Sequence, residues 1–142
     1  MKFIFIIISF MIAVFAQDIQ MQSRELSTKE MKKQNQEIVK LAANEMSKSV
    51  PKEIDKYTKL IAIEAQDTTL VYICEINTAP KSDEIVKKED RSRMQEAVIF
   101  GTCKNSQRFL EADISIRYIY KSRSTKAELF QFNINQEHCL KL

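Results

Sequence analysis

The sequence predicts a two-layer α+β domain in which an antiparallel four-stranded sheet is covered on one face by two helices. Three observations support this fold class. Two stretches place apolar residues at helical spacing, two pairs of stretches are rich in strand formers, and the elements follow one another in the order α-β-β-α-β-β. An antiparallel sheet with one apolar face must bury that face, and the two amphipathic helices are the only cover that the sequence provides.

The first sixteen of the 142 residues have the composition of a secretory signal peptide. Lys2 is followed by an apolar run over residues 3–15, and a run of this length is shorter than the roughly 20 residues that span a bilayer as a helix. We therefore expect cleavage after residue 16, with an uncleaved membrane anchor as the alternative. The rest divides into a flexible N-terminal segment, residues 17–26, and a single α+β domain, residues 27–142.

The first helix of the predicted domain runs from Thr28 to about Lys48. Ser27 lies three residues before Glu30, which is the spacing of a capping box at a helix N-terminus. Pro51 ends the helix, because proline disfavours helical backbone in the residue before it. The apolar stripe expected to face the sheet consists of Met31, Ile38, Leu41, Ala42 and Met46.

A β-hairpin is predicted after this helix. Residues 59–65 and 69–77 are rich in isoleucine, valine, leucine and tyrosine, and residues 66–68 lie between them as a polar turn.

The second helix is expected to begin at Ser82 or Asp83 and to end near Phe100, where Gly101 can take a left-handed conformation and close it. Its apolar residues are Ile85, Val86, Met94, Ala97 and Val98. A short helical turn is expected at residues 107–111.

The last hairpin carries the clearest pattern in the chain. Apolar and polar residues alternate along "DISIRYIYKS" and again along "AELFQFNIN", and "RSTK" between them forms the turn. The inward residues are Ile114, Ile116, Tyr118, Tyr120, Phe130, Phe132 and Ile134. From the helices we expect this hairpin to be covered by Ile38, Leu41, Met46, Val98 and Phe100.

The three cysteines all follow the predicted signal peptide, so they would reach an oxidising compartment in which disulfides form. Cys74 shares its strand alternation with apolar residues, so we expect a small buried side chain there. Cys103 follows the second predicted helix and Cys139 follows the last strand, where loops can adjust to disulfide geometry. The sequence therefore favours a Cys103–Cys139 disulfide, with a bridge to Cys74 or three free thiols as alternatives.

The single histidine, His138, directly precedes Cys139. In a strand-like tail the two side chains would point to opposite sides, which disfavours a catalytic Cys-His pair, although His138 could still approach Cys74 in space. One histidine without a C-x-x-C motif does not suit zinc, and the sequence contains no G-x-S-x-G, H-E-x-x-H or EF-hand motif. We expect no catalytic residue, no metal site, no cofactor, and a protein that is not an enzyme.

One candidate binding face lies on the predicted strand "ISIRYIY". Arg117, Tyr118 and Tyr120 combine a guanidinium with two aromatic rings, a composition common at protein interfaces. The alternative is that the tyrosines only pack in the core and at the sheet edge. A basic cluster of Arg108, Arg117, Lys121 and Arg123 could meet an acidic partner or lipid head groups, but ordinary solvation is the favoured explanation.

Charge patterning argues against nucleic acid as a partner. The formal net charge is +3, or +3 − 1 = +2 once Lys2 is removed with the signal peptide, and lysine and glutamate alternate rather than cluster. We therefore expect a protein partner, no nucleic acid, and no stable membrane anchor after cleavage.

The part of the chain from Val50 to Cys139 resembles a family of small exported bacterial proteins of poorly defined role, some described as quorum-sensing-regulated virulence factors. The resemblance lies in "VPKEIDKYTKL", in Cys103, in "ISIRYIY" and in "FQFNINQEHC". It implies an α/β sandwich and a Cys103–Cys139 bridge, and it attaches no catalytic residues to this pattern. The family's usual glycine in the last turn is replaced here by "RSTK".

These inferences support a small exported protein, periplasmic or secreted, that acts by binding, in host interaction or in the cell envelope. The second hypothesis is a periplasmic inhibitor or immunity protein that blocks an enzyme with a loop or a sheet face. The third is a hydrolase with an unrecognised site.

Overall fold

The computed structural model describes residues 27–142. The predicted signal peptide, residues 1–16, and the predicted flexible segment, residues 17–26, lie outside the described residues. The helices and strands are α2 (Thr28–Ser47), β1 (Lys52–Glu53), β2 (Thr58–Gln66), β3 (Thr69–Ile76), α3 (Asp83–Asn105), α4 (Gln107–Glu111), β4 (Ser115–Ser122), β5 (Glu128–Ile134) and α5 (Gln136–Cys139).

The α+β class is confirmed, but the sheet differs from the predicted one. It has five strands in the order β1-β2-β3-β4-β5, and β3 and β4 run parallel while the other neighbours are antiparallel. The expectation of four antiparallel strands was therefore wrong. The physical reason is α3, because a helix of 23 residues returns the chain to the end of the sheet at which β3 began, and β4 then starts beside β3.

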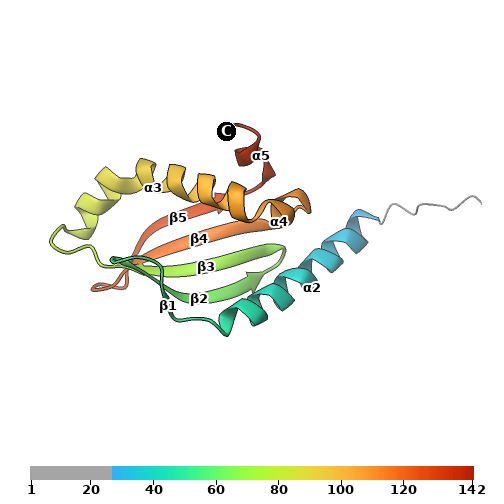
Figure 1. Ribbon diagram of the computed structural model, residues 1–142, viewed down its shortest axis with the longest axis horizontal. Coiled ribbons are helices and arrows are strands. Elements are labelled where there is room, and N and C mark those ends of the chain that lie inside the picture. The colour runs from blue at the N-terminus through green and yellow to red at the C-terminus, as the bar shows by residue number, and fades with distance from the viewer. Residues whose placement is uncertain (1–26) are drawn as a thin grey trace, which may run out of the picture.

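Both long helices lie on the same face of the sheet and cover opposite margins of it (Figure 1). α2 packs on β2 and β3, whereas α3 packs on β5 and on the short helices α4 and α5. The central strands β3 and β4 thus lie between the two main points of helix contact. None of the helices in residues 27–142 is long and apolar enough to cross a membrane.

Helix α2 begins with the predicted capping box. Ser27 Oγ accepts from the backbone N–H of Glu30, and the Glu30 carboxylate accepts from the backbone N–H of Ser27. The predicted apolar stripe was out of phase, since the buried residues are Asn35, Val39 and Ala43.

The displaced residues of α2 are largely exposed. Met31 is 42%, Ile38 37% and Leu41 69% accessible, whereas Met46 packs against the core as expected. The observed phase buries the apolar Val39 and Ala43 and lets the Asn35 amide donate to the backbone carbonyl of Ala112 at 2.6 Å.

Helix α3 starts at the predicted N-cap, where Ser82 accepts from the backbone N–H of Ile85, but it does not end at Gly101. It continues to Asn105, and Gly101 keeps a negative φ inside the helix. Phe100 was expected in the core but is 62% exposed, whereas Val98 packs against the core. The short helix α4 lies at the predicted residues.

The core is one cluster between the sheet and the helices. Residues directly opposite one another in β3, β4 and β5 share the covered face, as in the rows Leu70–Ile116–Ile134 and Tyr72–Tyr118–Phe132. The two predicted hairpins are confirmed, and their turns contain Asp67 and Lys126 with positive φ values of 54° and 62°. The inward residues of the last hairpin are therefore placed as predicted, with Tyr118 the least buried of them.

Candidate functional site

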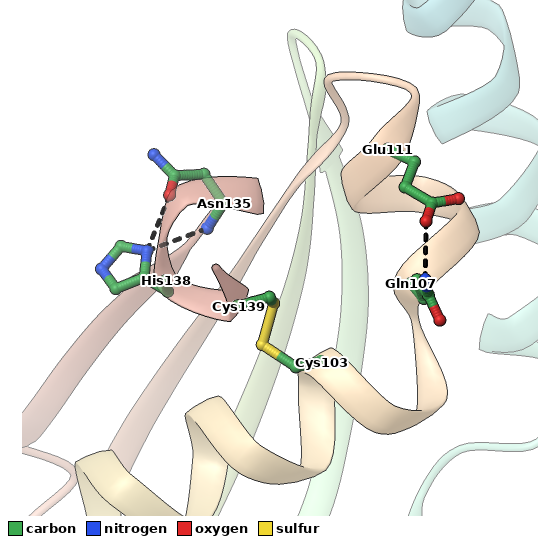
Figure 2. Close-up of a disulfide and its surroundings, with 6 residues drawn as sticks. All are labelled: Cys103, Gln107, Glu111, Asn135, His138 and Cys139. Atoms are coloured by element: carbon green, nitrogen blue, oxygen red, sulfur yellow. Dashed lines mark hydrogen bonds between the residues drawn. A yellow bond between two sulfur atoms is a disulfide. The ribbon is translucent and has the colours of Figure 1, made fainter. Parts of the chain in front are cut away.

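Cys103 and Cys139 form a disulfide, the pair that the sequence favours, with their Cα atoms 5.5 Å apart. Figure 2 shows that it joins the last turns of α3 to the short helix α5. Neither cysteine lies in a loop, contrary to the expectation, because α3 extends past Gly101 and the predicted strand-like tail forms one helical turn. The covalent link therefore fixes the C-terminal helix against α3.

His138 contacts Asn135 within the turn of α5 and is not paired with a thiol. Its Nδ1 lies 3.2 Å from the backbone nitrogen of Asn135 and 2.7 Å from the Asn135 Oδ1, and the ring points away from the disulfide (Figure 2). Cys74 is the free cysteine, 4% exposed, and burial together with the nearby Asp55 raises the pKa of its thiol to about 12. A thiol held in this state is a poor nucleophile.

The candidate binding face suggested by the sequence is divided between the two faces of the sheet. Arg117 lies on the face without helices, where its guanidinium donates to Asn133 Oδ1 at 2.5 Å and to Gln66 Oε1 at 3.0 Å. Tyr118 and Tyr120 lie on the helix-covered face, because side chains alternate along β4. These three residues do not form one continuous surface.

The two tyrosines belong instead to an aromatic row across the sheet. The ring centroids of Tyr72 and Tyr118 are 5.0 Å apart and those of Tyr118 and Tyr120 are 6.2 Å apart, with nearly parallel planes. Tyr120 is 8% exposed, whereas Tyr72 and Tyr118 are only half-buried. The helices thus leave the middle of the covered face incompletely shielded at Tyr72 and Tyr118.

The α3 side of this region is open at Gly101. Thr102 is 2% exposed and faces the core. The next residue, Cys103, is bonded to Cys139 of α5 and so marks the side of α3 that faces α5. Successive residues of a helix are about 100° apart, so Gly101 lies on the side of Thr102 opposite to Cys103. A Cβ atom placed on Gly101 would have no other atom within 4 Å. Ala97, one turn earlier on the same side, is exposed.

The α2 side is formed by residues that face away from β2. Ser47 and Gln36 of α2 bond to β2 and to the β2–β3 turn, whereas Asn35 bonds to the loop before β4. Ile38, nearly one turn after Asn35, lies on that β4-facing flank. Met46 contacts the floor directly, since the Tyr72 hydroxyl lies 3.7 Å from its sulfur.

We call this region the interhelical strip. It has a floor of two half-buried tyrosines, an α2 side and an α3 side, and none of its members carries a charge. The interhelical strip consists of Tyr72, Tyr118, Ile38, Met46, Ala97 and Gly101.

Burial governs the electrostatics of the floor. Burial and the neighbouring Tyr118 raise the pKa of Tyr72 to about 12. Burial raises the pKa of Tyr118 as well, although the nearby Thr102 hydroxyl lowers it by a smaller amount. Both tyrosines are therefore neutral hydroxyls at physiological pH, and the described residues contain no cluster of three or more potential metal ligands of the His, Cys, Asp or Glu type.

Residues 28–130 match the family model described as "Domain of unknown function (DUF8479)". The chain belongs to this family. The matched range contains α2, α3 and the strands β1 to β4, and it ends within β5, before Cys139. No protein with a curated description matches the chain in sequence.

Three solved structures share the fold of this family member. PA3611 of Pseudomonas aeruginosa, a protein thought to be secreted, gives a TM-score of 0.68 at 12% identity over 77% of this chain and 96% of that protein. The type 2 secretion system pilotin EpsS of Vibrio vulnificus gives 0.65 at 13% identity over 78% and 96%. The pilotin AspS of Vibrio cholerae gives 0.57 at 15% identity over 78% and 96%. At these identities the likeness concerns the fold.

Sequence reasoning misses the interhelical strip for two reasons. Helical periodicity assigns Ile38 to the core, and the preference of glycine for helix ends assigns Gly101 to the end of α3. The sequence contains one clue to the true phase of α2. Asn35 is a polar residue within the face of α2 that the structure buries, so a search for an apolar stripe passes over that face.

Proposed function

We propose that this protein is an exported binding protein of the cell envelope, and that it holds an apolar segment of a partner protein in the interhelical strip. The observation that carries the proposal is the uncharged surface that these residues offer on three elements. Ile38 of α2 is exposed, and Tyr72 and Tyr118 of the sheet are half-buried. A Cβ atom on Gly101 of α3 would meet no other atom within 4 Å. Contiguous exposed apolar surface on a soluble domain marks an interaction site more often than chance exposure does.

Two observations support export. The first sixteen residues have the pattern of a signal peptide, and the Cys103–Cys139 disulfide suits an oxidising compartment. The fold is similar to that of a protein thought to be secreted and to that of secretion-system pilotins, which agrees with a periplasmic or secreted location.

We also propose that the protein is not an enzyme. The histidine and the free thiol do not form a Cys-His pair. His138 contacts Asn135 in the turn of α5, and Cys74 is buried with a raised pKa. Binding through uncharged surface needs none of these groups.

A site-specific photo-crosslinker at Ile38, in cells that naturally make the protein, tests the proposal. Lys40 is the matched control, because it is exposed on the same helix and points to the opposite flank. Gly101→Leu is the blocking variant, since it fills the strip without removing a contact. We expect one adduct from position 38, none from position 40, and loss of the adduct in Gly101→Leu. Equal adducts from both positions would rule the strip out.

A second candidate function, inhibition of an enzyme by a loop, is favoured by the loop between β1 and β2. Ile54 is 54% and Tyr57 51% exposed, and Asp55 Oδ1 accepts from the backbone N–H groups of Tyr57 and Thr58 at 2.8 Å each. Such a loop presents two apolar side chains at little entropic cost. A crosslinker at Tyr57 that captures an enzyme, with none captured at Ile38, would favour this alternative.

A further inference from the structure

The two edges of the sheet differ in how far the fold occupies them. At the β2 edge, β1 pairs with Lys59 and Leu60, and the Ile63 carbonyl accepts from Ser47 Oγ at 2.9 Å. At the other edge lies β5, which has no further strand beside it within residues 27–142. β5 contains no proline or lysine, the residues that commonly protect an exposed edge from pairing. This edge therefore offers backbone groups to which another strand can bond.

The hydrogen bonds of β4 show which backbone groups of β5 point outward. The Ser122 N–H donates across the β4–β5 turn at 2.8 Å, and backbone groups alternate along a strand, so the even-numbered residues of β4 bond to β5. Their register partners include Phe132 and Ile134. Gln131 and Asn133 alternate with these residues, so their N–H and C=O groups point away from the sheet. No backbone hydrogen bond from another element of residues 27–142 reaches them.

Helix α3 lies along this edge and gives it a positively charged side (Figure 1). The guanidinium carbon of Arg91 lies 5.7 Å from the centroid of the Phe132 ring, so Arg91 faces β5. Lys88 precedes Arg91 by one helical turn and shares its flank. Within residues 27–142 neither of them forms a salt bridge, although the neighbouring Arg93 pairs with Asp90 at 2.7 Å. Two cations are thus free to meet a ligand beside β5.

We propose that an extended segment of a partner protein adds to β5 as a sixth strand, and that an acidic side chain of this segment meets Arg91. The outward groups of Gln131 and Asn133 supply the backbone hydrogen bonds, as in other cases of strand addition to a sheet edge. Side chains alternate along the added strand, so every second one faces the α3 flank. The free cations of that flank favour aspartate or glutamate there. This site is separate from the interhelical strip and does not depend on it.

A second copy of this chain fits the edge poorly. Pairing β5 with β5 of another copy about a twofold axis places both α3 helices on the same face of the joined sheet. Neighbouring strands are about 4.8 Å apart, whereas packed helices need about 8–10 Å between their axes. The main sheet contact of α3 is with β5 rather than further inward on β4, so the two helices would overlap. An extended segment without a helix avoids this overlap.

Three capped heptapeptides test the proposal while the partner is still unidentified. The first alternates threonine and glutamate, the second alternates threonine and lysine, and the third is the first with every backbone nitrogen methylated. Each is titrated into the purified protein, and the backbone NMR signals and hydrogen exchange of Gln131 and Asn133 are followed. Ala65 is the matched control, because the register of β2 with β3 points its backbone outward at the opposite edge.

We expect the glutamate peptide to shift and protect the amides of Gln131 and Asn133 and to leave Ala65 unchanged. It should bind at least about threefold more tightly than the lysine peptide, and Arg91→Gln should weaken it by about two- to fivefold, the range of a partly exposed ion pair. Gln131→Pro should weaken binding more than Gln131→Ala, because proline removes the outward N–H and alanine keeps it.

The inference is overturned if the methylated peptide binds as well as the first, if the lysine peptide binds as well as the glutamate peptide, or if no peptide shifts Gln131 and Asn133. It is also overturned if sedimentation shows a dimer that Gln131→Pro dissociates, because a second copy would then occupy the edge. The methylated peptide keeps the test valid if Gln131→Pro fails to fold, since it alters the probe and not the protein.

Discussion

Removal of the Cys103–Cys139 disulfide should destabilise the domain more than loss of any one of its side-chain hydrogen bonds. The two cysteines are 36 residues apart in sequence, and the closed loop contains the C-terminal end of α3, α4 and the whole β4–β5 hairpin. On the chain-entropy model a loop of this length restricts the unfolded chain by about 4 kcal/mol. For a domain of this size the corresponding fall in thermal midpoint is about 12–20 °C.

The assay is chemical denaturation of the Cys103→Ser/Cys139→Ser variant without reductant, beside the wild type with and without reductant. The reduced wild type should match the double variant, because both lack the same covalent link. Cys74→Ala is the matched control, since Cys74 is the free, buried cysteine and its replacement leaves the bridge intact. The control should show a smaller loss and an unchanged mobility on non-reducing gels.

The reasoning would be refuted if the double variant unfolded within about 1 kcal/mol of the oxidised wild type. It would also be refuted if peptide mapping without reduction placed Cys74 in a disulfide.

Three further predictions concern single side chains. Asn35→Ala should cost about 1–2 kcal/mol in urea unfolding, because it leaves the Ala112 carbonyl without its 2.6 Å donor; a change near zero would contradict this. A hydrogen bond from Thr125 holds the pKa of Asp83 below its usual 3.8. The stabilisation is therefore complete well above 3.8 and is lost as pH falls from there through the lower pKa of the folded state. Asp83→Asn should therefore flatten the decline of the urea midpoint between about pH 5 and pH 3, and an unchanged slope would count against it. Gly101→Ala should raise stability by about 0.5–1 kcal/mol in the same assay, because Gly101 is helical and uncrowded; a loss would show that the strip is closed there.

Local patterns in the sequence are enough to predict most of the elements. The capping box at Ser27 and Glu30 marks the start of α2, and the alternation in β4 and β5 gives both the strands and the residues they bury. These signals depend on neighbouring residues only, which is why a single sequence contains them.

The direction of β4 relative to β3 is not a local property. A hairpin and a crossover both place two strands side by side, and the choice depends on whether the intervening helix spans the sheet. Gly101 misleads the prediction of where α3 ends. Glycine favours a helix end, but it is tolerated inside a helix at a cost of about 1 kcal/mol. The phase of α2 escapes prediction for a similar reason, because burial of Asn35 depends on the distant Ala112 carbonyl.

The parallel crossover also explains why the fold has an interhelical strip at all. β3 and β4 are parallel neighbours, so α3 has to run the length of the sheet between them, and it packs on β5 and is fixed there by the disulfide to α5. α2 packs on β2 near the other margin, where Ser47 donates to the backbone carbonyl of Ile63. The main sheet contacts of the two helices are thus with β2 and β5, and the strands β3 and β4 lie between them (Figure 1). These two strands carry the stacked Tyr72 and Tyr118. A surface produced by topology in this way is rigid on both sides, which lowers the entropic cost of binding a partner there.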